Sequence, residues 1–286
     1  MSTTALALVL TAALLHATWN LAAKGVTGDR VAFIWLYVVT TVVCWGPVAV
    51  VWVVVRDETP DWSWLLGAAV TAVLHIAYQL VLQRGYAEGD LNLVYPLARG
   101  SGPLLTFVFA VAVLGQRPGL VPAAGVLAVV AGVLLIALGR GLHGVRAGVA
   151  WGLLTGATIA SYTLWDNFSV NHLDVPPLPY FVLGTVLQVP WLALLLARRR
   201  EPQSLREVWR AARGPVLVVG ILSPLAYVLV LRALQLAPVA LVAPARETSI
   251  VVGALFGWLV LREPRPARRL VGAAIVLAGI ALIAVG

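Results

Sequence analysis

The sequence has few of the residues and motifs on which enzymes and metal sites depend. Its single cysteine, Cys44, lies in an apolar run and excludes an intrachain disulfide or a thiolate cluster. The four histidines have no metal-ligand spacing, and no nucleotide-binding loop, hydrolase motif or zinc-protease motif occurs. We therefore expect no enzyme activity, no cofactor, no metal site and no direct use of ATP.

Charge is also scarce, and apolar side chains replace it. Charged residues make up 11% of the 286 residues and hydrophobic residues 61%, with a mean hydropathy of +0.94. This composition is typical of a polytopic protein in a lipid bilayer and excludes an ordinary soluble domain. The net charge of +8 comes from basic residues that lie mostly between apolar runs. The positive-inside rule explains them, so nucleic acid is not an expected partner. No basic residue precedes the first apolar run, so we expect no cleavable signal peptide.

Ten apolar runs are long enough to cross a membrane, which takes about 20 residues. They cover roughly residues 4–23, 31–55, 63–83, 91–114, 120–138, 147–168, 178–197, 214–234, 237–261 and 267–285. The connections are short except for 198–213, where Ser204 and Glu207 have capping-box spacing. That connection predicts a short amphipathic helix lying on the membrane surface. The predicted fold class is all-α integral membrane, with ten transmembrane helices.

The second half of the sequence repeats the first. Residues 94–139 align without a gap to 241–286, and this alignment pairs Arg99 with Arg246. The repeat unit holds five helices, and because five is odd the second copy enters the membrane from the opposite side. We therefore expect two inverted repeats, 1–139 and 147–286. Secondary transporters have this construction, with the binding site between the repeats.

Arg99 and Arg246 each lie inside an apolar run, shortly after a proline. A charge in lipid costs about 2.5–3.5 kcal/mol on insertion scales, so each arginine should face a partner or a watery cavity. Because proline lacks a backbone N–H, we expect a loosened backbone beside both arginines, and Pro103 should free the carbonyl of Arg99. The arginines could anchor an anionic group or form a gating ion pair. A structural pair with an acid or with backbone carbonyls is the alternative.

Asp166 and Glu247 are the only acids clearly within apolar runs. A carboxyl group there is a candidate proton carrier, so both residues are candidates for coupling transport to a proton gradient. Glu247 is about 100° round a helix from Arg246, so we expect it to pair with another helix or to face the cavity. We expect Asp166, near the end of its run, to lie within reach of water.

Polar and aromatic side chains recur at helical spacing in three of the runs, and each set should face the interior of the bundle. A binding cavity is one interpretation, and hydrogen bonding between helices, worth about 0.6 kcal/mol on average, is the other. The residues predicted to line the cavity are His16, Trp19, Asn20, His75, Tyr78, Gln79, Tyr95, Arg99, Tyr162, Trp165, Tyr227 and Arg246.

Short motifs occur at matching points of the two halves. They are YPLARG, which ends at Gly100, ARETS at 245–249, and the turns GQRP at 115–118 and REP at 262–264. With these motifs the whole chain resembles the EamA family of the drug/metabolite transporter superfamily. Gln116 stands where the family's turn usually has Glu. The resemblance implies ten helices in two halves and transport of small metabolites, mostly outward.

Together these observations predict a secondary active transporter in the cytoplasmic membrane. It would export a small polar or amphipathic metabolite by alternating access, driven by a proton or substrate gradient, as a monomer or homodimer. A non-transporting membrane subunit or a component of a lipid-linked flippase is one alternative. An intramembrane enzyme that uses His and Asp on a lipid-linked substrate is another.

The distribution of basic residues predicts the orientation. Of the basic residues in the connections and at the ends of the apolar runs, only Arg56, Arg117 and Arg232 fall on the same side as the N-terminus. By the positive-inside rule both termini face outward, and 198–213 faces the cytoplasm. Many members of the family that the chain resembles have cytoplasmic termini, so the two indications disagree, and we follow the charge distribution.

Overall fold

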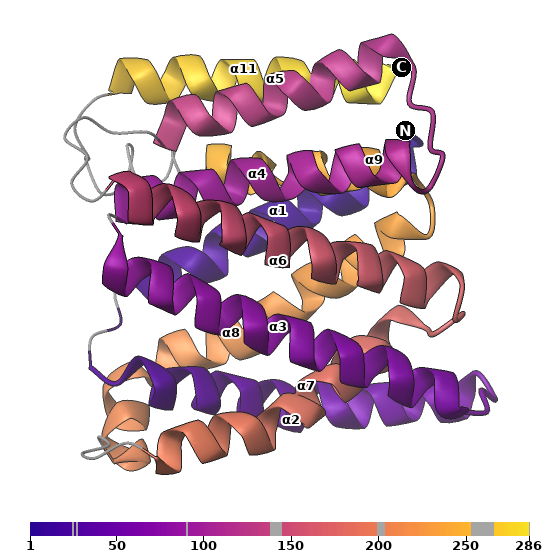
Figure 1. Cartoon of the computed structure of the whole chain (residues 1–286). Coiled ribbons are helices and arrows are strands. Elements are labelled where there is room, and N and C mark those ends of the chain that lie inside the picture. The colour runs from indigo at the N-terminus through magenta and orange to yellow at the C-terminus, as the bar shows by residue number, and fades with distance from the viewer. Residues whose placement is uncertain are drawn as a thin grey trace.

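The chain forms a bundle of helices that run along one common direction, with both ends of the chain at the same end of the bundle (Figure 1). The computed structural model describes residues 1–24, 26, 28–89, 91–137, 145–198, 204–252 and 266–285, and these contain helices but no strand. The helices are α1 (Thr3–Lys24), α2 (Arg30–Val55), α3 (Trp62–Glu88), α4 (Leu91–Ala112), α5 (Leu120–Ala137), α6 (Val145–Asn171), α7 (Pro177–Ala197), α8 (Leu205–Leu234), α9 (Val239–Ala245) and α11 (Pro266–Val285).

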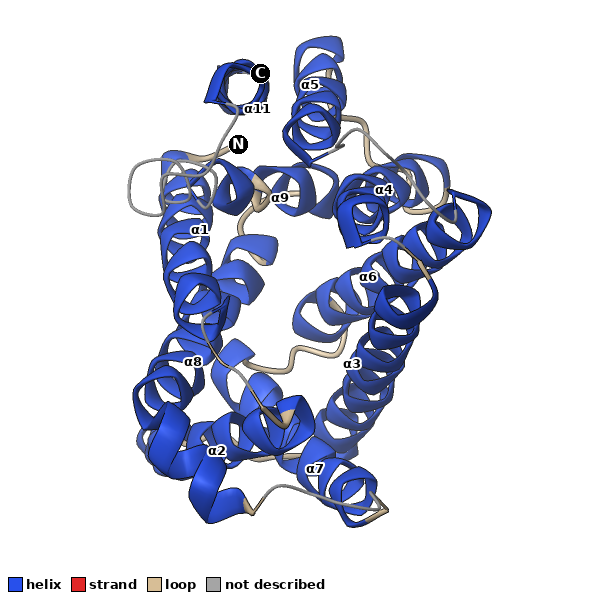
Figure 2. Cartoon of the chain, turned by 90° about the vertical axis from the view of Figure 1, so that its left-hand side faces the viewer, coloured by secondary structure: helices blue, strands red, loops and turns tan. Residues whose placement is uncertain are grey.

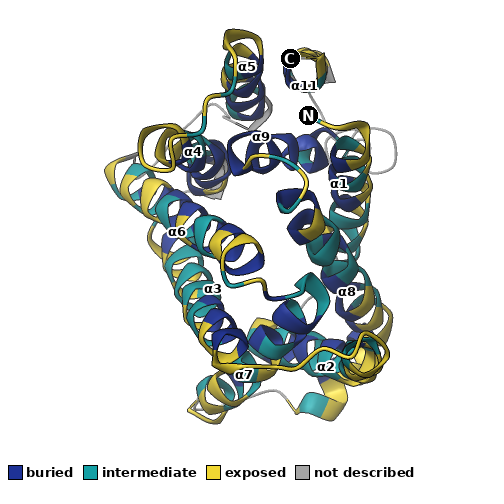
Figure 3. Ribbon diagram, turned by 90° about the vertical axis from the view of Figure 1, so that its right-hand side faces the viewer, coloured by how far each residue is buried: buried dark blue, intermediate teal, exposed yellow. Residues whose placement is uncertain are grey.

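Apolar side chains cover much of the outside of the bundle. Among the described residues, six helices are long and apolar enough to cross a membrane, namely α1, α2, α3, α4, α7 and α8. Exposed segments lie mainly on the outer faces of the helices (Figure 3), and many large apolar residues are among them, such as Val54 at 72% and Leu120 at 91% exposure. An apolar outer surface of this extent suits a lipid environment, because in water it would favour aggregation.

Helix α8 is one helix that includes part of the predicted connection 198–213 and the predicted run 214–234. Ser204 caps its start in a capping box with Glu207, as predicted, and a kink at Ala212 divides the first turns from the long apolar part. Val208 and Ala212 are buried in a cluster with Ala32 and Phe33 of α2. The first turns of α8 therefore pack partly on α2, and the location of this segment on the membrane surface stays a prediction.

The helix beside the two arginines is interrupted in only one half. Helix α9 ends at Ala245, residues 246 and 247 form a turn, and helix resumes at Thr248. Helix α4 instead continues through Arg99 and both nearby prolines without interruption, although Pro103 has no N–H to donate to the carbonyl of Arg99.

Close packing of α6 explains the continuity of α4. A Cβ atom added at Gly148, Gly152 or Gly156 of α6 would lie 3.0 Å or less from side-chain atoms of α4. Such a stripe of small residues lets two helices approach closely, and the neighbouring helix then supports the backbone at a proline.

Residues 253–261 of the ninth predicted run and the motif 262–264 lie outside the described residues.

Helices α5 and α11 cross through glycines. A Cβ atom on Gly125 would lie 2.6 Å from the carbonyl oxygen of Gly279, and one on Gly132 would lie 2.7 Å from that of Gly272. The two helices are therefore antiparallel. The offset of 147 residues converts Gly125 into Gly272 and Gly132 into Gly279, so it exchanges the two contacts.

The offset of 147 residues also relates other helix pairs to one another. Helix α1 packs on α8 as α6 packs on α3, and α2 packs on α8 as α7 packs on α3. Viewed along the bundle, these helices with α4 and α9 form a ring, and α5 and α11 lie outside it beside α4 and α9 (Figure 2). Helices of the two halves are therefore neighbours around the ring, and the two halves also meet at the α4–α9 contact.

Candidate functional site

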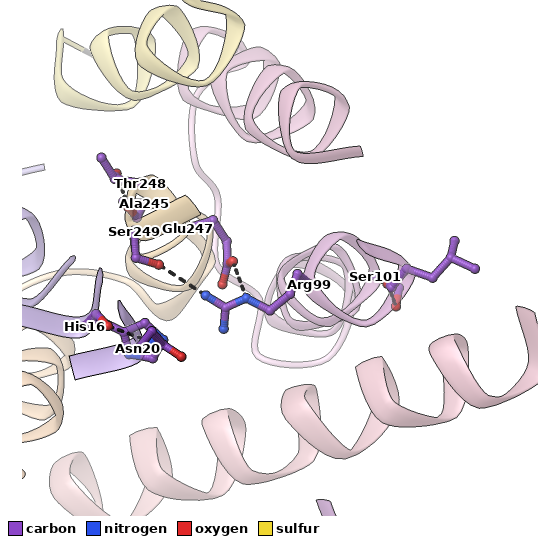
Figure 4. A network of polar contacts seen from close by, with 9 residues as sticks. His16, Asn20, Arg99, Ser101, Ala245, Glu247, Thr248 and Ser249 are labelled. Carbon is purple, nitrogen blue, oxygen red and sulfur yellow. Dashed lines mark hydrogen bonds and ion pairs between the residues drawn. The ribbon is translucent and has the colours of Figure 1, made fainter. Parts of the chain in front are cut away.

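A buried ion pair joins α4 to the turn after α9 (Figure 4). Nε of Arg99 lies 3.0 Å from Oε2 of Glu247, and Nη2 of Arg99 donates a hydrogen bond of 3.2 Å to the hydroxyl of Ser249. Arg99 is 8% exposed and Glu247 only 1%. The prediction that Glu247 pairs with another helix is confirmed. The pair holds the two halves of the chain together where they meet.

Arg246, the neighbour of Glu247, is also buried, at 7% exposure. Within the ranges that the structure describes, it forms no ion pair or hydrogen bond, and its Nε is buried without a partner. Its guanidinium lies within electrostatic range of Tyr162, Tyr227 and Glu247. In the alignment of the two halves, Gly100 occupies the position equivalent to Glu247. Helix α4 therefore has no acid that could pair with Arg246 as Glu247 pairs with Arg99.

Asp166 lies at the centre of a second polar cluster and is 0% exposed. Its Oδ1 accepts hydrogen bonds of 2.6 Å from the hydroxyls of Thr71 and Tyr180, and its Oδ2 accepts one from the hydroxyl of Tyr227. The three donors belong to α3, α7 and α8. The prediction that water reaches Asp166 was wrong, because these side chains cover it.

Aromatic rings connect the Asp166 cluster to the arginines. The ring of His75 stacks on Tyr162 with centroids 4.4 Å apart and meets Tyr227 edge-on at 5.7 Å. Nδ1 of His75 lies 3.0 Å from the Thr71 hydroxyl, and Tyr78 meets Tyr162 edge-on at 5.6 Å. Because Tyr162 and Tyr227 are also close to Arg246, the predicted residues His75, Tyr78, Tyr162 and Tyr227 share one region with both clusters.

On α1, His16 lies within electrostatic range of both arginines and contacts the ring of Trp19 edge-on at 4.6 Å. Asn20 is exposed, and its side-chain amide donates to the backbone carbonyl of His16.

Tyr95, on α4 with Arg99, is 41% exposed and lies within electrostatic range of the Arg99 guanidinium. Nε1 of Trp165 donates to the carbonyl of Gly67, and Gln79 is half-buried with no hydrogen bond to the described residues. Among the described residues Asn20, Gln79 and Trp165 form no hydrogen bond with the arginines or with Asp166, so their place in a cavity stays a prediction.

Sequence reasoning missed several contributors. Thr71 lies four residues before His75, so the helical spacing of that set could have been extended to it. Tyr180 gave no comparable signal, and Ser249 was noted only as the last residue of the ARETS motif. Gln116 accepts a hydrogen bond from the backbone N–H of Ala240 and so caps the start of α9 from the other half. No group of three or more His, Cys, Asp and Glu side chains in the described segments could hold a metal ion.

Comparisons with known proteins give a consistent result. The model of the EamA-like transporter family matches the chain twice, over residues 3–138 and 146–285. A solved structure titled only as a protein crystal structure is similar in fold, with a TM-score of 0.74 and 18% sequence identity over 99% of this chain and 96% of the other. None of the curated proteins matches the chain.

Proposed function

Since the chain belongs to the EamA-like transporter family, of the drug/metabolite transporter superfamily, we propose that it is a secondary active transporter that exports a small polar or amphipathic metabolite. It is a multi-pass membrane protein. The proposal places it in the cytoplasmic membrane, as a monomer or homodimer that works by alternating access, with a proton or substrate gradient as the energy source.

The proposal includes two inverted five-helix repeats with bounds near 1–139 and 147–286. Its support is the antiparallel crossing of α5 and α11, where equivalent glycines exchange contacts under the offset of 147 residues. Equivalent helices that cross antiparallel are what a two-fold axis in the membrane plane produces.

The observation that carries the transport mechanism is the buried Arg99–Glu247 ion pair between the two halves. A change of access requires the halves to separate on one side of the membrane, and a polar contact between them can open and re-form while an apolar seal stays in place. The Asp166 cluster also combines a donor from the first half, Thr71, with donors from the second.

The test is reconstitution of the purified protein into liposomes. Ligand-dependent thermal stabilisation first selects metabolites from a panel, and their flux is then measured with and without an imposed pH gradient. We expect flux of the stabilising ligands above that of protein-free liposomes and accumulation when the gradient is present. A membrane subunit would show neither binding nor flux, and an enzyme would convert a ligand in detergent without any gradient.

A further inference from the structure

Three charged side chains are buried where α4 meets the turn after α9, and their charges do not balance. Glu247 neutralises Arg99 through the 3.0 Å ion pair, whereas Arg246 has no ion pair or hydrogen bond within the described ranges. Asp166, the other buried acid described, forms no ion pair with either arginine within those ranges, and its three hydrogen bonds come from neutral hydroxyls. Arg246 is therefore a buried cation, at 7% exposure, that has no directly paired acid among the described residues.

An unpaired buried charge is costly, and a ligand of opposite charge would remove that cost by neutralising it. We propose that Arg246 binds the carboxylate of the transported substrate, and that the substrate is a small monocarboxylate with an apolar or aromatic body. This inference rests on the proposed transport function and names the substrate class for it.

The chemistry of the site favours one carboxylate over a group of higher charge. A guanidinium presents two parallel N–H donors that match the two oxygens of a carboxylate. A single uncompensated arginine matches one negative charge, and a doubly charged anion would leave an excess charge in a place with little water. Arg99 cannot supply the second positive charge while Glu247 holds it.

The surroundings of Arg246 suit the rest of such a molecule. The Tyr162 hydroxyl has no hydrogen-bond partner in the part of the chain that the structure describes, and it is close to the guanidinium. The rings of His75, Tyr78, Tyr162 and Tyr227 form a continuous aromatic cluster beside it. Aromatic surfaces with one charged anchor are the usual composition of a site for a small organic acid.

The binding test uses matched acids and amides, which differ in charge but hardly in size. Benzoate, phenylacetate and lactate are compared with benzamide, phenylacetamide and lactamide by thermal stabilisation of the detergent-purified protein. We expect at least one acid to stabilise the wild-type protein and its amide to have no effect. Arg246→Gln should weaken the binding of that acid about 10- to 100-fold, the range for a hydrogen bond to a charged group, and Arg246→Lys should weaken it less. Phthalate, a dianion, should bind more weakly than benzoate.

A second readout needs no ligand. Arg246→Gln removes an unpaired charge, so its melting temperature should equal or exceed that of the wild type. Arg99→Gln, the matched control, strands Glu247 and should lower the melting temperature. The inference is overturned if Arg246→Gln is as destabilised as Arg99→Gln, if no acid stabilises the wild type, or if acids and amides stabilise it equally. Selective binding of acids without flux in liposomes would support the inference and contradict the proposed function.

Discussion

Glu247 is the residue whose replacement should disturb the buried charges most. Changing it to Gln leaves Arg99 buried without a counter-charge, and breaking a buried pair in this way costs about 3–5 kcal/mol. We expect Glu247→Gln to lower the free energy of unfolding by about that amount. The double variant Arg99→Gln/Glu247→Gln should recover most of it, because neither charge then remains. Denaturant unfolding in detergent measures both, and equal instability of the single and double variants would contradict the pairing.

The double variant also tests whether Glu247 carries the coupling proton. Gln cannot release a proton, so a transporter coupled through Glu247 should lose pH-driven accumulation in liposomes while downhill exchange continues. The double variant is the better choice because the single one combines lost coupling with lost stability. If accumulation persists at the wild-type level, Glu247 is a structural partner of Arg99 and the proton moves elsewhere.

Asp166 should matter more for stability than its sequence position suggests. Three hydroxyls donate to its two oxygens. Asn has one oxygen, and its amide group would face donors, so Asp166→Asn should destabilise the fold by about 1–3 kcal/mol. Tyr180→Phe removes one donor and leaves the carboxylate with two, so the loss should be nearer 1 kcal/mol. Thermal unfolding shows which of the two variants loses more stability, and a larger loss of stability for Tyr180→Phe than for Asp166→Asn would contradict the prediction.

At the scale of helices, the crossing of α5 and α11 offers a matched pair of substitutions. A Cβ atom on Gly125 would lie 2.6 Å from a backbone oxygen, which can move only with its helix, whereas Gly46 of α2 has nothing within 4 Å. We expect Gly125→Ala to cost about 1–3 kcal/mol, as overpacking does, and Gly46→Ala to be neutral or stabilising by up to about 1 kcal/mol. Melting temperatures in one detergent compare them, and similar values would mean that the glycine contact is unimportant.

The helices themselves could be predicted from the sequence because apolar length alone defines them. Their interruptions could not. A proline precedes each arginine by two or three residues, yet only the segment at Arg246 is broken, since α4 lies against the glycine stripe of α6 and sequence spacing does not reveal that contact. Likewise, helical spacing identified His75, Tyr78 and Tyr162, which do meet. It could not identify Tyr180, because the orientation of α7 depends on packing.

At the scale of the whole molecule, the orientation in the membrane can be tested directly. Both termini lie at the same end of the bundle as the turn between α2 and α3 and the turn between α4 and α5 (Figure 1). That end carries few basic residues, so we expect it to face outward. A C-terminal alkaline phosphatase fusion should be active and a C-terminal green fluorescent protein fusion dark. If the green fluorescent protein fusion is fluorescent, the protein lies in the membrane with the opposite orientation, and the fold is unaffected.

The mismatch between Gly100 and Glu247 has a consequence for the resting protein. If two inverted halves were identical, the inward-open and outward-open forms would be related by the two-fold axis, and without a membrane potential they would be equally populated. Here one half supplies an acid and a broken helix, and the other supplies glycine and a continuous helix. The two forms then differ in energy, and a difference of about 1.4 kcal/mol already sets their populations at ten to one. Under the proposed alternating-access mechanism, the unloaded protein would therefore rest predominantly open on one side, and the negative charge of a carboxylate bound at Arg246 would shift that balance.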